Sequence, residues 1–259
     1  MQAGKRIAVA GATGRVGSHV VDVLESGGHD VVAMSRSTGV DVVTGDGVAA
    51  ALQGVDCIID TASGPSPDER AATEFFIAAT RNLQETGERA GVRRIVVVSI
   101  IGCDRFSSGY NAAKVAHERA MLAGPIPATI LRASQFHEFV AQLVEWGRQG
   151  DASYVPEMRT QLVAARSVAE VLADLATRPQ PSTVPGSSRA PILEIAGPRE
   201  ESLVETAKLL AARRGDPLRV EGVSDPANPD RELFEKGALL PGPGATLAGP
   251  TFEDWLDAS

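Results

Sequence analysis

The sequence predicts a doubly wound α/β fold, in which helices cover both faces of a parallel sheet. Up to about residue 131, short apolar runs alternate with amphipathic stretches, which is the order expected of βαβ units. The runs Ile-Val-Val-Val and Cys-Ile-Ile are apolar without alternation, as in strands that are buried on both faces. A glycine-rich turn joins the first apolar run to the first amphipathic stretch.

The elements of this first part follow from the spacing of the apolar residues. We expect strands at Arg6–Ala10, Asp30–Met34, Asp41–Val43, Cys57–Asp60, Ile95–Ser99 and Ala128–Leu131, and helices at about Arg15–Ser26, Val48–Gln53, Asp68–Ala90 and Ser108–Leu122.

The pattern loosens after residue 131. We expect a helix at Gln135–Arg148, a strand at Gln161–Ala165, a helix at Ser167–Thr177, an exposed loop at Arg178–Ser188, a strand at Ile192–Ala196 and a helix at Ser202–Arg213. Prolines then interrupt the tail, so only short elements are expected there. We predict a single domain over residues 1–259, in which roughly residues 135–259 form a small substrate-side cap.

Composition and charge exclude several classes of protein. A formal net charge of −8 disfavours nucleic-acid binding, because an acidic surface repels phosphate backbones. No apolar run approaches the roughly 18 residues of a membrane span, and the N-terminus lacks a signal-peptide pattern, so we expect a cytoplasmic protein. Cys57 and Cys103 fall in or beside apolar runs and are expected to be buried thiols, and we expect no metal site.

The turn Gly11-Ala12-Thr13-Gly14-Arg15-Val16-Gly17 predicts a dinucleotide site. Glycines there allow a tight turn, close approach of the backbone to a pyrophosphate, and close packing of the helix on the strand. The following helix offers backbone N–H groups and a partial positive charge to the phosphates. We therefore expect a Rossmann-type fold whose cofactor contacts include Gly11, Thr13, Gly14, Arg15, Val16 and Gly17.

Residues after the next strands refine this cofactor prediction. Ser35 and Arg36 stand at the end of the second strand, where an acidic residue would favour NAD. Their presence favours NADP(H) over NAD(H), because an arginine can bind the additional phosphate of NADP. The alternative, that Arg36 is an ordinary surface residue, stays open. Asp46 is a candidate partner of the adenine amino group. Thr61, Ala62 and Ser63 follow the fourth strand, at the carboxyl edge of the sheet where ligands bind in such folds.

Tyr110 and Lys114 are the candidate catalytic pair, and Lys114 is also a candidate to hold the nicotinamide ribose of the cofactor. Their i, i+4 spacing places them on one helix face, where a nearby ammonium is expected to lower the pKa of the phenol. His117, three residues further on, is expected to be a packing residue, with a second proton donor as the alternative. Asp60 is expected to cap a strand end or turn.

These motifs resemble the short-chain dehydrogenase/reductase superfamily, in its extended and atypical branches, and within it the NmrA-like NAD(P)-binding oxidoreductases. The stretches Val98-Ser99-Ile100-Ile101-Gly102, Thr129–Phe136 and Phe252–Leu256 support the resemblance. It implies Tyr110 as general acid/base with Lys114 as its partner, Ser99 as the candidate third catalytic residue, and Gln135, Phe136 and His137 at the substrate. Relatives often carry the serine where this chain has Ile100 or Ile101, and Ser107 and Ser108 are possible substitutes.

The resemblance implies an NAD(P)H-dependent oxidoreductase that acts on a small, hydrophobic carbonyl or alcohol substrate. Two alternatives stay open. One is a dinucleotide-binding redox sensor that engages a partner without turnover. The other is an epimerase or dehydratase that uses the cofactor transiently. The sequence does not predict the substrate or the oligomeric state.

Overall fold

The computed structural model describes residues 4–179 and 192–258, and its central parallel sheet confirms the α/β class. The seven strands have the order β12-β9-β5-β4-β3-β1-β2, and β1 pairs in parallel with both β2 and β3. The strands of this sheet are β1 (Arg6–Ala10), β2 (Asp30–Met34), β3 (Cys57–Asp60), β4 (Arg94–Ile100), β5 (Ala128–Ala133), β9 (Ile192–Ala196) and β12 (Thr246–Leu247).

The chain divides into two compact units, each made of three segments. The first is Met1–Ser99, Gly109–Leu131 and Val168–Leu193, and the second is Ile100–Ser108, Arg132–Ser167 and Glu194–Ser259.

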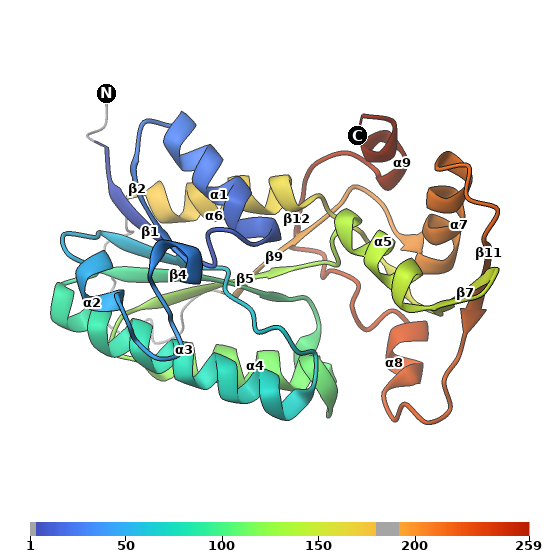
Figure 1. Ribbon diagram of the computed structural model, residues 1–259, viewed down its shortest axis with the longest axis horizontal. Coiled ribbons are helices and arrows are strands. Elements are labelled where there is room, and N and C mark those ends of the chain that lie inside the picture. The colour runs from blue at the N-terminus through green and yellow to red at the C-terminus, as the bar shows by residue number, and fades with distance from the viewer. Residues whose placement is uncertain (1–3, 180–191, 259) are drawn as a thin grey trace. The chain divides into compact units, whose positions relative to one another are not determined.

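In the first unit, helices cover both faces of the sheet. Helices α3 (Glu69–Ala90) and α4 (Gly109–Ala123) lie side by side on one face, and α1 (Arg15–Ser26) and α6 (Ala165–Thr177) lie on the other (Figure 1). Every residue of β3 is buried, as expected of an apolar run without alternation. The short helices η1 (Arg36–Thr38) and α2 (Val48–Ala51) belong to this unit as well, whereas η2 (Cys103–Arg105) belongs to the second.

The strand predicted at Asp41–Val43 does not form, so this prediction was wrong. The segment is a turn in which the Asp41 backbone N–H donates to the Asp46 carbonyl, and Asp41 Oδ1 accepts from the Val43 N–H at 2.8 Å. Asn82 of α3 donates from Nδ2 to the carbonyls of Val42 and Val43 at 2.9 and 2.8 Å. These backbone groups are therefore satisfied without a neighbouring strand.

The second unit has its own apolar core, around the parallel pair β7 (Ala152–Pro156) and β11 (Arg219–Val223). The prediction of a strand at Gln161–Ala165 was wrong: Val163 forms only an isolated parallel bridge with Phe136, and α6 begins at Ala165. The predicted loop at Arg178–Ser188 lies outside the described residues beyond residue 179. The remaining elements are α5 (His137–Trp146), β6 (Arg148–Gln149), β8 (Arg159–Thr160), β10 (Glu201–Ser202), α7 (Leu203–Arg213), α8 (Arg231–Glu235) and α9 (Phe252–Asp257).

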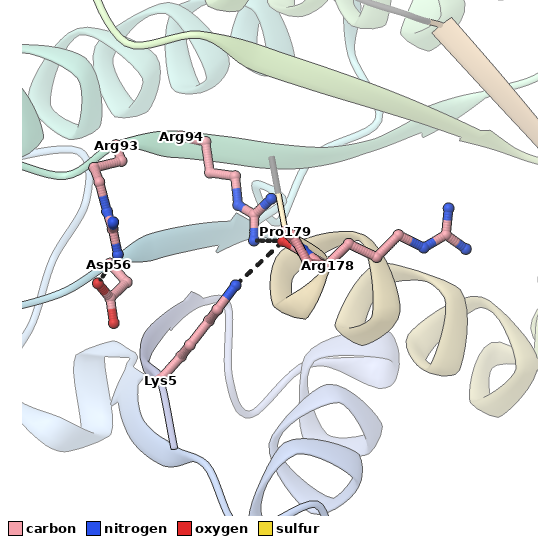
Figure 2. A pocket seen from close by; sticks show the side chains of 6 residues that line it. All are labelled: Lys5, Asp56, Arg93, Arg94, Arg178 and Pro179. Carbon is pink, nitrogen blue, oxygen red and sulfur yellow. Dashed lines mark hydrogen bonds and ion pairs between the residues drawn. The ribbon is translucent and has the colours of Figure 1, made fainter. Parts of the chain in front are cut away.

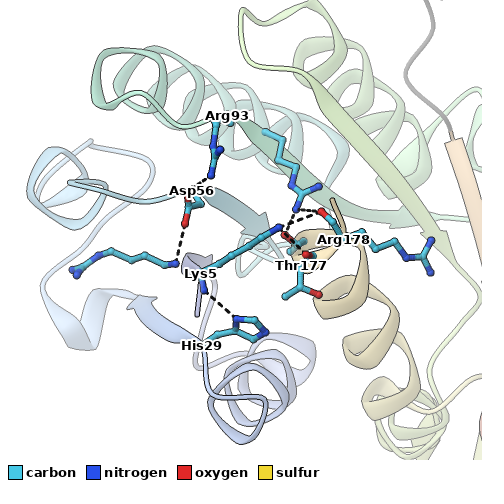
Figure 3. Close-up of polar contacts among 9 residues, drawn as sticks. Lys5, His29, Asp56, Arg93, Thr177 and Arg178 are labelled. Atoms are coloured by element: carbon cyan, nitrogen blue, oxygen red, sulfur yellow. Dashed lines mark hydrogen bonds and ion pairs between the residues drawn. The ribbon is translucent and has the colours of Figure 1, made fainter. Parts of the chain in front are cut away.

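Two cations lie at the C-terminus of α6. Lys5 Nζ donates to the carbonyls of Thr177 and Arg178 at 2.7 and 3.2 Å, as Figure 3 shows. Arg94 donates to the carbonyls of Ala176 and Arg178. The last carbonyls of a helix lack partners within the helix and carry partial negative charge, so both cations stabilise this end.

A cavity of about 170 Å³ adjoins these cations (Figure 2). Its remaining charged groups are largely paired with each other or with the helix: Arg93 pairs with Asp56, and Arg178 with Asp174. We therefore assign this cluster a structural role, as an anchor for the end of α6.

Replacing Arg94 by methionine is expected to lower the free energy of unfolding by about 1–2 kcal/mol, because the α6 carbonyls lose a charged donor. Arg70→Met is the matched control, since Arg70 forms an exposed pair with Glu74 on α3. It should cost no more than about 0.5 kcal/mol. Denaturant titration measures both changes, and equal losses would contradict the anchoring role.

Among the residues that the structure describes, no helix combines the length and the apolar character needed to cross a bilayer.

Candidate functional site

The turn between β1 and α1 is shaped by glycines that have no room for a side chain. Gly11 has a φ of +76°, and a Cβ there would lie 2.8 Å from the backbone N and Cα of Ala62. A Cβ on Gly17 would lie 2.1 Å from the Gly11 carbonyl oxygen. Gly14, the N-cap residue of α1, supplies no side-chain cap. The turn therefore places backbone without side chains next to the N-terminal end of α1, and this arrangement can bind a pyrophosphate.

A cavity of about 380 Å³ adjoins this turn in the first unit. Its size and its location at the carboxyl ends of the strands fit a dinucleotide site. Of the predicted cofactor residues, those that line it are Gly11, Thr13, Gly14, Ser35, Arg36, Thr61, Ala62 and Ser63. Of the other predicted residues of the turn, Val16 and Gly17 are buried and Arg15 is exposed.

The β2 end of this cavity carries hydroxyl groups and one exposed cation. The side-chain oxygens of Ser35 and Ser37 lie 2.8 Å apart, and Thr38 Oγ1 donates to the Ala33 carbonyl at 2.9 Å. These contacts hold the short helix η1, on which Arg36 lies exposed at the cavity. An exposed guanidinium between two serines can donate two parallel hydrogen bonds from one edge of its planar fork to a phosphate.

The acid at this cavity differs from the one that the sequence suggested. The cavity is lined by Asp41, Val42 and Val43, and Asp46 is not among its lining residues. The Asp46 carboxylate accepts a hydrogen bond from Thr44 Oγ1 at 2.8 Å and lies exposed. An adenine contact by Asp46 stays a prediction, for which the geometry offers Asp41 as the closer candidate.

Tyr110 and Lys114 lie on α4, and both side chains pack against the ring of Phe76 from α3. The Tyr110 and Phe76 ring centroids are 5.9 Å apart, and Lys114 Nζ lies 4.5 Å from the Phe76 centroid. Lys114 is buried and donates to the Val98 carbonyl of β4 at 2.9 Å. The structure thus places the predicted pair on one face of α4, beside the carboxyl end of β4.

The predicted lowering of the Tyr110 pKa is wrong in sign. Burial, and second the charge of Asp60, raise the pKa of Tyr110 to about 12. The Lys114 ammonium donates to the Val98 carbonyl and to His117 Nδ1, at 2.9 Å each. Tyr110 is therefore fully protonated at neutral pH, the form that can donate a proton.

Asp60 and His117 join this site, although the sequence suggested only a turn residue and a packing residue. His117 Nε2 lies 3.1 Å from Asp60 Oδ2, and the Phe76 ring stacks on the imidazole at 4.5 Å. The i, i+3 spacing of Lys114 and His117 was a signal in the sequence. Nothing local pointed to Asp60, which lies 57 positions earlier in the chain.

The serine candidates differ in their surroundings. Ser99 is buried within β4. In the second unit, the hydroxyls of Ser107 and Ser108 donate to the Asp230 carboxylate at 3.1 and 2.9 Å, and Asp230 is itself buried. These two hydroxyls are therefore engaged in a structural contact. Ser99 as a catalytic residue stays a prediction.

The predicted substrate residues lie in the second unit. Gln135 Oε1 accepts from Thr160 Oγ1 at 2.6 Å, and Phe136 is half-buried. His137 is buried against the rings of Phe252 and Trp255. Burial lowers the pKa of His137 to about 4, so the ring is neutral at physiological pH. These surroundings give His137 a packing role, and its contact with substrate stays a prediction.

Both cysteines are buried, as expected, and burial raises the pKa of Cys57 to about 11. Within residues 4–179 and 192–258, no group of three or more His, Cys, Asp or Glu residues is placed to hold a metal ion.

Comparison with known proteins agrees with this geometry. A family described as NAD(P)H-binding matches residues 11–179. The 3 beta-hydroxysteroid dehydrogenase/Delta 5→4-isomerase of Mycobacterium tuberculosis (strain ATCC 25618 / H37Rv) is 30% identical over 156 residues. The match covers 46% of this chain and 42% of that relative, which is less than half of the relative's length.

Solved structures share the fold at low sequence identity. The dTDP-4-dehydrorhamnose reductase (rfbD) of Bacillus anthracis str. Ames, in complex with NADP, has a TM-score of 0.70 at 16% identity and covers 98% of each chain. The Bordetella bronchiseptica enzyme WbmH, in complex with NAD+, also has a TM-score of 0.70, at 13% identity, and covers 98% of this chain and 97% of its own.

Proposed function

Because the chain belongs to the NAD(P)H-binding family and resembles extended short-chain dehydrogenases/reductases, we propose that it is an NAD(P)H-dependent reductase of a small organic carbonyl compound. Family membership supports a nicotinamide dinucleotide as the bound group, and the glycine turn and its cavity fit one. When bound, the reduced nicotinamide supplies a hydride to the substrate carbon.

The observation that carries the proposal is that the half-buried Tyr110 and the buried Lys114 lie on one helix and against the same Phe76 ring. Reduction of a carbonyl needs a proton for the oxygen, and a phenol with a pKa of about 12 holds that proton at neutral pH. Tyr110 is the proposed general acid. Lys114 is proposed to hold the cofactor ribose and to stabilise the tyrosinate that remains after proton transfer.

The test is a fluorescence titration with NADPH and NADH, followed by a turnover screen. The panel contains aldehydes, ketones and quinones, together with a 3-ketosteroid, because the curated relatives are hydroxysteroid dehydrogenases. NADPH oxidation that depends on one class of carbonyl would support the proposal. Failure of both nucleotides to bind would overturn the dinucleotide site itself.

A second candidate function is a dinucleotide sensor without turnover. It is favoured by Ile100 and Ile101, which stand where relatives often carry the active serine, and by the engagement of Ser107 and Ser108 with Asp230. Tight NADPH binding with no oxidation by any panel member would favour the sensor. Cofactor retained through purification, with substrate rearranged and no net oxidation, would instead indicate an epimerase or dehydratase.

NADP(H) is the proposed cofactor because Arg36 lies exposed at the cavity. Arg36→Ala should raise the NADPH dissociation constant about tenfold to hundredfold, the loss expected for charged hydrogen bonds to a phosphate. The NADH constant should change by less than about threefold, since NADH has no such phosphate. Arg70→Ala, on an exposed face of α3, is the control. Equal losses for both nucleotides would remove the basis for the NADP assignment.

A further inference from the structure

Three buried polar side chains form a chain of hydrogen bonds beside Tyr110. Asp60, His117 and Lys114 are 2%, 1% and 5% exposed. Lys114 Nζ lies 2.9 Å from His117 Nδ1, and His117 Nε2 lies 3.1 Å from Asp60 Oδ2. Burying an ammonium or a carboxylate is costly unless each is paired, so the three residues stabilise one another.

The two partners fix the protonation of the His117 ring. An ammonium only donates, so His117 Nδ1 must be unprotonated to accept its hydrogen bond. A carboxylate only accepts, so Nε2 must carry the ring proton. Burial, and second the Lys114 charge, lower the pKa of His117, which agrees with a neutral ring.

The surroundings hold this chain in one arrangement. Asp60 Oδ1 accepts from the Ala62 backbone N–H at 3.0 Å, which leaves Oδ2 toward His117. The Phe76 ring stacks on the imidazole at an interplanar angle of 9°. A rotation of the His117 ring would break both of its hydrogen bonds and this stacking contact. The ring is therefore a fixed acceptor for Lys114.

We propose that His117, oriented by Asp60, is a positioning residue that holds the Lys114 ammonium in place for carbonyl reduction, an inference that rests on the proposed function. A lysine side chain has four flexible methylene groups, and one acceptor alone would leave its ammonium free to move. In this site the Val98 carbonyl and His117 Nδ1 both accept from it. Asp60 lies on the other side of the neutral His117 ring and carries the negative charge that offsets the positive charge of Lys114.

A double-mutant cycle tests whether His117 acts through Lys114. His117→Leu should lower kcat/KM about tenfold to hundredfold in the chain of residues 1–259, as expected when a catalytic group is displaced. In a Lys114→Met background the same change should have less than about a twofold effect, because no ammonium remains to be positioned. Independent, multiplying losses would overturn the proposal.

Two further variants separate positioning from packing. His117→Asn keeps an acceptor near the place of Nδ1 and should recover activity to within about threefold of the wild type. His117→Gln reaches further, toward Asp60, and should stay as impaired as His117→Leu. Circular dichroism and thermal unfolding establish that each variant is folded. Equal activity of the Asn and Gln variants would overturn the proposal.

The same cycle distinguishes this inference from the proposed function. If the wild type binds NADPH but reduces no member of the panel, the reductase proposal fails, and the four variants of the cycle are compared by their NADPH dissociation constants. Non-additive losses of affinity at His117 and Lys114 would still support positioning. Additive losses, or none, would overturn it.

Discussion

Tyr110→Phe is expected to lower the rate of NADPH-dependent carbonyl reduction by about two to four powers of ten, the contribution usual for a general acid. The variant loses one hydroxyl and keeps the ring that packs against Phe76, so the fold and the NADPH dissociation constant should be unchanged. Steady-state kinetics and a fluorescence titration measure the two quantities separately.

Tyr154→Phe is the matched control, because the chain contains two tyrosines and Tyr154 lies in β7 of the second unit. It should retain full activity. Undiminished reduction by Tyr110→Phe would mean that another group donates the proton.

The raised pKa of Tyr110 also predicts a pH dependence. With a pKa of about 12, the phenol stays protonated from pH 6 to 9, so its ionisation should not lower the reduction rate in this range. Oxidation of the corresponding alcohol needs tyrosinate as the base, so its rate should rise about tenfold for each pH unit. An oxidation rate that levels off below pH 8 would show that the working pKa is far lower.

Gly11→Ala is expected to raise the NADPH dissociation constant by about one to two powers of ten, because the new methyl group would push the Ala62 backbone away at a cost of about 1–3 kcal/mol. Both residues line the cavity, so the displacement deforms its wall. Isothermal titration with NADPH measures the loss.

Gly28→Ala is a closely matched control for this change. Gly28 has the same φ of +76°, and a Cβ there would meet nothing within 4 Å. Both variants should lose about 1–2 kcal/mol of stability from the left-handed backbone, and Gly11→Ala should lose more because of its clash with Ala62. Gly28→Ala should bind NADPH normally. Similar affinities of the two variants would mean that the close approach of Gly11 to Ala62 does not shape the site.

The parts of the site that the sequence predicted correctly depend on local constraints. The β1–turn–α1 unit is encoded by glycines that tolerate no side chain, and the strands β3 and β4 by unbroken apolar runs. The prediction at Asp41–Val43 failed because Asn82, about forty positions away, satisfies the carbonyls of Val42 and Val43. The pattern of the segment itself is compatible with a strand, and no local signal names its distant partner.

The electrostatics of the site were the least predictable part. The spacing of Tyr110 and Lys114 suggested that the ammonium lowers the phenol pKa. The sign depends on burial of Tyr110 beside Phe76 and on Asp60, neither of which the helix sequence contains. Likewise, the sequence suggested that His117 is a packing residue. Its carboxylate partner, Asp60, lies in β3, far from the helix in the sequence.

The parallel pairing of β7 with β11 has a consequence for how the chain folds during its synthesis. The end of β7 at Pro156 and the start of β11 at Arg219 are about sixty residues apart, so the ribosome must release this whole segment before the two strands can meet. Until then, one edge of β7 has open hydrogen-bonding groups that strands of other nascent chains can pair with. The β7–β11 pair can therefore form only after residues up to Val223 have left the ribosome, later than the local pairing of β6 with β7.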